Sequence, residues 1–102
     1  MISYDNDIKQ NWRDIDGFDG YLISDLGNVL NKHGRVLKTY TDKHKPRDGA
    51  KIRLYIGKQR KVQMIKRLVA AAFIECIEGK TVSIKNLQKP ITPSNLIIRV
   101  KA

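Results

Sequence analysis

The chain has 102 residues, a formal net charge of +10 and a single cysteine, Cys76. This length is enough for one domain with a modest core, and one cysteine excludes both an intrachain disulfide and a cysteine-based structural zinc site. No segment approaches the roughly 20 apolar residues of a membrane span, and the start lacks a signal-peptide pattern, so we expect a soluble protein of the cytoplasm with no membrane partner.

The positive charge is unevenly distributed along the chain. Residues 1–30 contain six aspartates against two basic residues, a net charge of −4, whereas residues 31–102 contain 18 basic residues against four acidic ones, a net charge of +14. A field of this sign attracts a polyanion, and nucleic acid is the most common one in the cytoplasm. The alternative is a lysine-rich surface that serves solubility and has no partner.

The N-terminal part is expected to contain a leader and three short strands. Residues 1–11 indicate a loosely docked leader, and turn-forming residues then separate segments of strand-forming residues. The three strands are expected at residues 20–24, 29–30 and 35–38. Trp12, Phe18 and Tyr21 are expected to supply the core of this meander, because aromatic side chains bury the most area in a small domain. Ser24 is expected to bond locally within a turn rather than to act as a nucleophile.

The middle of the chain contains its clearest alternation of apolar and polar residues. Residues 39–50 have no periodicity and are expected to form an exposed loop. Residues 51–56 and 60–64 alternate around a turn, which predicts a two-stranded ribbon with one face in the core and one basic face. The expected core face carries Ile52, Leu54 and Ile56, and the other face carries Lys51, Arg53 and Tyr55.

A helix is predicted over residues 65–76. Its apolar stripe consists of Ile65, Leu68, Val69, Ala72, Phe73 and Cys76. We therefore expect Cys76 to be a buried small hydrophobe, and Gly79 to cap the helix in a left-handed conformation. Residues 81–84 and 95–100 are β-prone and flank a loop. The whole pattern predicts an α+β fold in which small antiparallel β-hairpins pack on one central helix.

Basic side chains gather before, along and after the predicted ribbon. The candidate nucleic-acid-binding residues are Lys43, Lys45, Arg47, Lys51, Arg53, Tyr55, Lys58, Arg60, Lys61 and Lys66. A two-stranded ribbon fits the major groove, where Arg and Lys contact phosphates or base edges and a tyrosine can stack. The alternative is that this face is the solvated side of a sheet. For Arg67 the sequence leaves the role open between extension of the basic patch and a packing or ion-pair role.

Three motifs resemble one known family. The run WRDIDGFDGYLISDLGNV at residues 12–29 resembles the opening module of phage and intron-borne HNH homing endonucleases. RLVAAAFI at residues 67–74 resembles a helix of that family, and VSIKN at residues 82–86, followed by Asn95 and Leu96, resembles its histidine-bearing segment. The resemblance implies one domain over residues 1–102, with a nuclease-associated β module at 12–38 and a degenerate HNH-like region at 51–100 that ends in a truncated ββα-metal-like part.

The resemblance also implies a lost active site. In this family a histidine at a strand end is the general base, and a divalent cation polarises the scissile phosphate. Ile84 occupies the histidine position and Ser83 the neighbouring ligand position, while Lys66 stands where the helix motif has a histidine. Asn95 corresponds to a residue that ties down a loop, and the chain reaches Ala102 before a metal-bearing helix. We therefore expect no catalytic residue, no metal, no cofactor and no enzymatic activity.

The remaining histidines, His33 and His44, have no ligand-like neighbours in the sequence and are expected to be solvated loop residues. The sequence as a whole favours a non-catalytic protein of phage or mobile-element origin that binds nucleic acid, duplex DNA above all. The alternative is a phage inhibitor that binds a host protein, of the host-takeover or anti-CRISPR type, and the acidic N-terminal third favours it. A subunit that lends DNA binding to an active nuclease is a third possibility.

Overall fold

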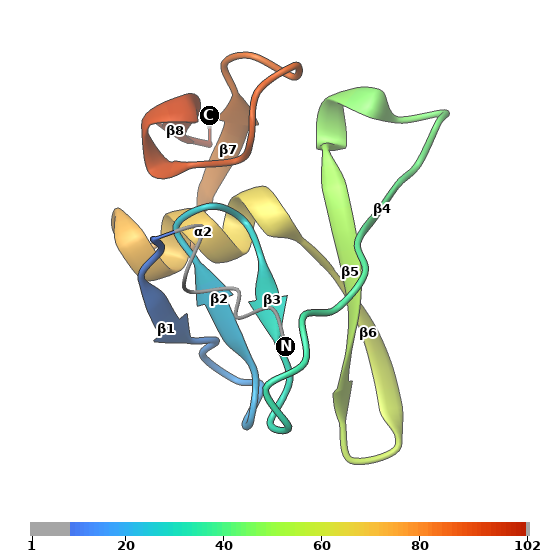
Figure 1. The fold of residues 1–102 in the computed structure, drawn as a ribbon. Coiled ribbons are helices and arrows are strands. Elements are labelled where there is room, and N and C mark those ends of the chain that lie inside the picture. The colour runs from blue at the N-terminus through green and yellow to red at the C-terminus, as the bar shows by residue number, and fades with distance from the viewer. Residues whose placement is uncertain (1–8, 102) are drawn as a thin grey trace.

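The computed structural model of the chain describes residues 9–101, so most of the predicted leader lies outside the described residues. The described part is a mixed α+β fold of short antiparallel sheets around a single α-helix, as predicted (Figure 1). Its elements are β1 (Trp12–Asp14), β2 (Leu22–Ser24), β3 (Val29–Leu30), β4 (Tyr40–Thr41), the 3-10 helix η1 (Pro46–Asp48), β5 (Ala50–Ile56), β6 (Gln59–Met64), α2 (Ile65–Phe73), β7 (Lys80–Ile84), the 3-10 helix η2 (Pro93–Asn95) and β8 (Leu96–Val100).

The first sheet has the order β1-β2-β3 and corrects one predicted strand. The β2–β3 hairpin forms as expected, but residues 35–38 contribute only an isolated bridge between Val36 and Leu30. The third strand is β1 instead, and the bonds of the Asn11 backbone and side chain to the Asp25 carboxylate hold it beside β2. Ser24 has the predicted turn role, because its buried hydroxyl accepts the backbone N–H groups of residues 26 and 28.

The second sheet has the order β4-β5-β6 and lies beside the first (Figure 1). The predicted ribbon is confirmed as the β5–β6 hairpin. The expected loop over residues 39–50 is wrong in part, because it contains β4 and η1. Ile52 and Leu54 are buried as predicted, but Ile56 is 47% exposed, since the ribbon extends past the core toward its turn.

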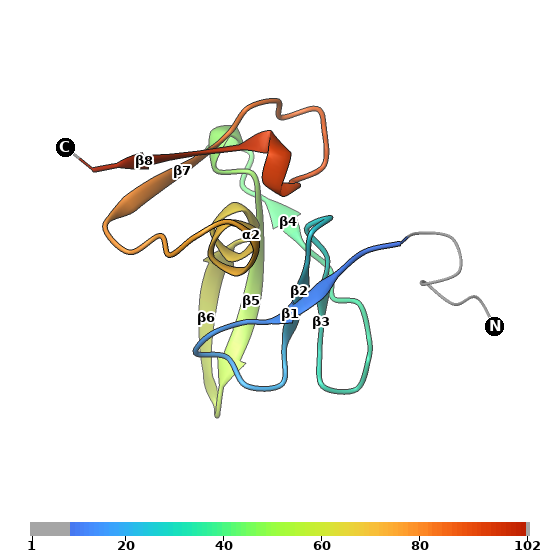
Figure 2. The ribbon, with the colours of Figure 1, turned by 90° about the vertical axis from the view of Figure 1, so that its left-hand side faces the viewer.

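The helix α2 lies between the first sheet and the β7–β8 hairpin (Figures 1 and 2). It ends at Phe73, so the predicted continuation to residue 76 is wrong, and Cys76 is exposed rather than buried. Gly79 has a positive φ but lies just before β7 instead of capping the helix. The Arg13 guanidinium donates to the Ala72 carbonyl at 2.7 Å and so ties β1 to the last turn of α2.

The core is mainly aliphatic, in contrast to the predicted aromatic core. Phe18 is buried, but Trp12 and Tyr21 are only half-buried. The most completely buried large side chains are Ile23, Val29, Ile52, Leu54, Ile65 and Val69, which come from β2, β3, β5 and α2. One hydrophobic cluster therefore joins both three-stranded sheets to the helix. No helix within residues 9–101 is long and apolar enough to cross a membrane.

Candidate nucleic-acid interface

The register of the β5–β6 ribbon divides the predicted basic residues between two faces. Arg53 pairs with Val62 and Tyr55 pairs with Arg60, whereas Leu54 pairs with Lys61. Paired residues project from the same side of an antiparallel sheet. The face that carries Arg53, Tyr55 and Arg60 is therefore the outer face, and Lys61 projects from the opposite face, next to the buried Leu54. All four of these polar side chains are exposed.

Two tyrosines from outside the ribbon contact β5. The Arg53 guanidinium lies 4.2 Å from the centroid of the Tyr40 ring, which β4 places beside β5. The backbone N–H of Tyr55 donates to the Tyr21 hydroxyl at 3.2 Å, which joins the ribbon to the first sheet. Sequence reasoning did not identify Tyr40, although its β-prone neighbour Thr41 was a signal that this segment forms a strand.

The remaining candidates on β5 and the preceding segment differ in their environment. The ammonium of Lys51 lies 3.1 Å from the Asp48 carboxylate, and its side chain is only 12% exposed. Lys43, Lys45 and Arg47 are exposed on the segment that leads through η1 into β5. Exposed basic residues thus lie at both ends of β5, since Lys58 occupies the turn after this strand. The charge of Lys51, within the strand, is partly neutralised by Asp48.

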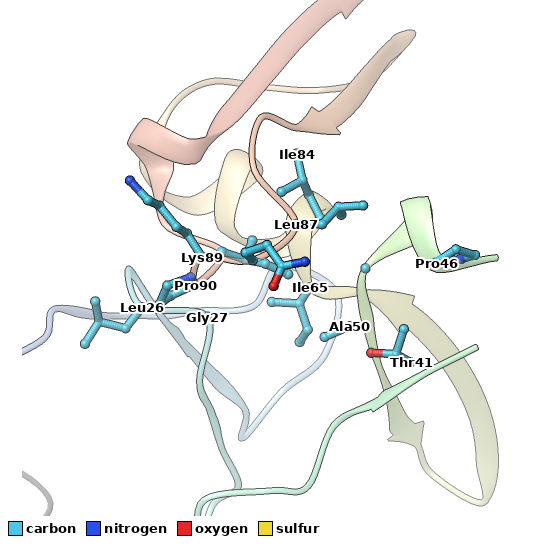
Figure 3. A pocket seen from close by; sticks show the side chains of 13 residues that line it. Leu26, Gly27, Thr41, Pro46, Ala50, Ile65, Ile84, Leu87, Lys89 and Pro90 are labelled. Carbon is cyan, nitrogen blue, oxygen red and sulfur yellow. The ribbon is translucent and has the colours of Figure 1, made fainter. Parts of the chain in front are cut away.

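A hollow lies between η1, the start of α2 and the end of β7. Its lining includes Arg47, Lys66 and Lys85 together with Ile84 and Ser83. A second hollow of about 500 Å³ adjoins it, and Ile65, Ile84, Leu87 and Pro90 are among the residues around it (Figure 3). The structure brings Lys66 close to Arg47 although 18 positions separate them in the sequence, and it adds Lys85, which sequence reasoning did not select.

The two positions that the resemblance assigns to catalysis lie at the end of β7. Ile84 is half-buried, packs against the core and pairs with Leu96, and Ser83 is exposed and pairs with Ile97. An isoleucine side chain can neither accept a proton nor bind a cation, and a single serine hydroxyl is a weak ligand for a hard metal. Residues 9–101 contain no group of three His, Cys, Asp or Glu side chains that could hold a metal ion.

The loop after β7 is organised by Asn95, as the resemblance implies. The Asn95 side chain is buried, its amide nitrogen donates to the carbonyls of Asn86 and Pro90, and its oxygen accepts the backbone N–H of Asn86. These bonds fix the loop between β7 and β8 in place. The loop that follows Ile84 is therefore held by the side chain of one residue.

Several other charged residues have defined structural positions. The Arg67 guanidinium donates to the Lys80 carbonyl at 3.0 Å, so this side chain links α2 to the start of β7. His33 and His44 are exposed on turns, as expected. The exposed acidic side chains of Asp14, Asp16 and Asp19 lie at and after the end of β1, away from the basic ribbon in the sequence.

Comparisons with known proteins give two matches. The family described as the NUMOD4 motif matches residues 11–67, from the residue before β1 into the first turn of α2. Among solved structures, one of the HNH homing endonuclease I-HmuI, which describes DNA binding and cleavage by that enzyme, is similar with 30% sequence identity and a TM-score of 0.74. The similarity covers 88% of this chain and 52% of that chain, so the chain spans about half the length of the endonuclease. No curated protein matches significantly.

Proposed function

This chain belongs to the NUMOD4 motif family and is a relative of the homing endonucleases, and on that premise we propose that it binds duplex DNA through the β5–β6 ribbon without hydrolysing it. The main support for this proposal is that the ribbon combines an apolar anchor in the core with exposed basic side chains. Ile52 and Leu54 anchor one end of it in the core, while Arg53, Arg60 and Lys61 are exposed along it. A twisted two-stranded ribbon is narrow enough for the major groove, and its cations can neutralise flanking phosphates.

The non-catalytic part of the proposal rests on Ile84 and Ser83. Hydrolysis of a phosphodiester by this family's mechanism needs a base that activates water and a cation that polarises the phosphate. Neither side chain supplies a base or a strong metal ligand, whereas the loop bonds of Asn95 keep the surrounding backbone organised. The proposed protein therefore folds as a homing-endonuclease relative and binds DNA in the cytoplasm of a host cell. Its effect comes from binding a DNA site and not from cleaving it.

A second candidate, binding of a host protein, is favoured by a different observation. The exposed carboxylates of Asp14, Asp16 and Asp19 form an acidic segment that suits a basic protein surface better than DNA. The two candidates are separated by a pull-down from host lysate with and without nuclease treatment. Co-purification of DNA that nuclease removes supports the first proposal, and a stoichiometric host protein that survives nuclease treatment supports the second.

A further inference from the structure

Two arginines in the described part of the chain lie over aromatic rings, and they differ in what their N–H groups bond to. The Arg13 guanidinium lies 4.9 Å from the centroid of the Phe73 ring and is satisfied by the Ala72 carbonyl. The Arg53 guanidinium lies 4.2 Å from the centroid of the Tyr40 ring, but within residues 9–101 it has no hydrogen-bond or ion-pair partner. Arg13 thus bonds within the protein, whereas the N–H groups of the Arg53 guanidinium are free to donate to a ligand.

The pairing of β4 with β5 explains why Arg53 is held. Tyr40 pairs with Lys51, so the ring lies on the outer face of β5, diagonally next to Arg53. Stacking on an aromatic ring fixes the plane of a guanidinium and leaves its N–H edge free for a planar pair of acceptors. On the other side of Arg53, β6 places Val62, whose side chain is 50% exposed.

The position of Arg53 along the strand indicates which acceptors it meets. Arg53 is the middle residue of β5, with Lys58 in the turn at one end and Arg47 in η1 at the other. When a ribbon lies in the major groove, the centre of its outer face is nearest the base edges, and its ends are nearest the phosphates. Guanine presents two acceptors there, N7 and O6, which match the two parallel donors of an arginine.

We propose that Arg53, positioned by Tyr40, reads a guanine in the major groove by donating to its N7 and O6 atoms. This inference rests on the proposed DNA binding of the ribbon and adds to it the base that the ribbon recognises. It makes Arg53 the specificity-determining residue and Tyr40 its positioning residue. The other exposed ribbon cations then supply affinity that does not depend on sequence.

The test is selection of duplexes from a random library with the full chain and four variants. Arg53→Gln removes the bidentate donors, and Arg35→Gln is the matched control, because Arg35 is an exposed arginine outside the ribbon. Tyr40→Phe keeps the ring, and Tyr40→Leu removes it. Thermal midpoints measured in parallel verify that each variant is folded, and the Arg53→Gln comparison stands by itself if Tyr40→Leu does not fold.

We expect the wild type to select a guanine at one position, where any other base lowers affinity by about 5-fold to 150-fold. Arg53→Gln loses this preference and Tyr40→Leu weakens it, whereas Tyr40→Phe and Arg35→Gln retain it. An unchanged preference in Arg53→Gln overturns the inference, and an unchanged preference in folded Tyr40→Leu overturns the positioning role. If the wild type binds duplexes without a base preference, this inference is refuted but the proposed function is not. If the wild type binds no duplex, the proposed function itself is refuted.

Discussion

The side chain of Ile84 fills the space over Gly49, so that a β-carbon at position 49 would overlap the Cδ1 atom of Ile84. Gly49 follows η1 and is buried with a φ of +73°, and Ile84 is the last residue of β7. The position that the family resemblance assigns to a general base is therefore a packing position in this chain, where it joins the C-terminal hairpin to the segment before the ribbon.

This packing predicts that Gly49→Ala destabilises the protein more than Gly57→Ala. Both glycines have a positive φ, which costs an alanine about 1 to 2 kcal/mol, but a β-carbon at Gly57 meets no atom within 4 Å. Overlap with the terminal methyl of Ile84, which can move to another rotamer, should add about 0.5 to 1.5 kcal/mol at position 49. Denaturant unfolding of the two variants measures the difference, and equal losses would contradict the account.

The double variant Gly49→Ala with Ile84→Val is the companion experiment. Valine lacks the Cδ1 atom that a β-carbon at position 49 would meet, so part of the loss should be recovered, while the cost of the positive φ remains. Strictly additive losses in the double variant would show that the two residues do not interact.

Asn95→Ala should lower the free energy of unfolding by about 2 to 4 kcal/mol, because it removes three hydrogen bonds made by a buried side chain to the backbone of the β7–β8 loop. Ser94→Ala is the control, since Ser94 is exposed and surface substitutions usually change stability by less than about 0.5 kcal/mol. Chemical denaturation followed by circular dichroism gives both values. A loss in Asn95→Ala no larger than that in Ser94→Ala would rule out its anchoring role.

The ribbon is expected to carry most of the DNA affinity. Replacement of Arg53, Lys58, Arg60 and Lys61 by alanine should weaken duplex binding strongly and leave the thermal midpoint nearly unchanged, because all four side chains are exposed. A control variant loses four exposed charges outside the ribbon, at Lys32, Arg35, Lys38 and Lys101. Fluorescence anisotropy with a labelled duplex measures both. Similar losses in the two variants would place the interface elsewhere or indicate binding by net charge alone.

Ile84→His is not expected to create a nuclease. The new imidazole would be a base without a cation, because Ser83 remains beside it and residues 9–101 contain no cluster of metal-ligating side chains. Wild type and variant are incubated with supercoiled plasmid and Mg²⁺ or Mn²⁺, with a chelator as control. Nicked or linear product that disappears with chelator, from either protein, would overturn the non-catalytic part of the proposal.

The sequence predicted elements whose periodicity is strong and local. The β5–β6 ribbon followed from alternation over eleven positions, and the β2–β3 hairpin followed from turn chemistry at residues 25–28. β1 was missed because its three residues show no alternation, and its pairing depends on contacts made by Asn11 and Asp25 across the sheet. Ile56 was expected in the core because periodicity gives the face of a residue but not where the core ends.

The candidate interface was predictable as a set of residues but not as an arrangement. Alternation placed Arg53 on the outer face, whereas the pairing register, which decides that Lys61 points to the other side, depends on the turn. The stacking of Arg53 on Tyr40 could not be predicted, because Tyr40 was assigned to a loop. The neutralisation of Lys51 by Asp48 likewise depends on the backbone path through η1.

The affinity of the full chain for a duplex across a range of salt concentrations tests the central claim most directly. Each neutralised phosphate contributes a slope of about −0.9 in log K against log salt, so engagement of three or more ribbon cations predicts a slope of about −3 or steeper. Denaturing gels of the same samples, with Mg²⁺ present, should show intact strands. A flat salt dependence, or no binding at low salt, would contradict the proposal that this chain acts by occupying DNA.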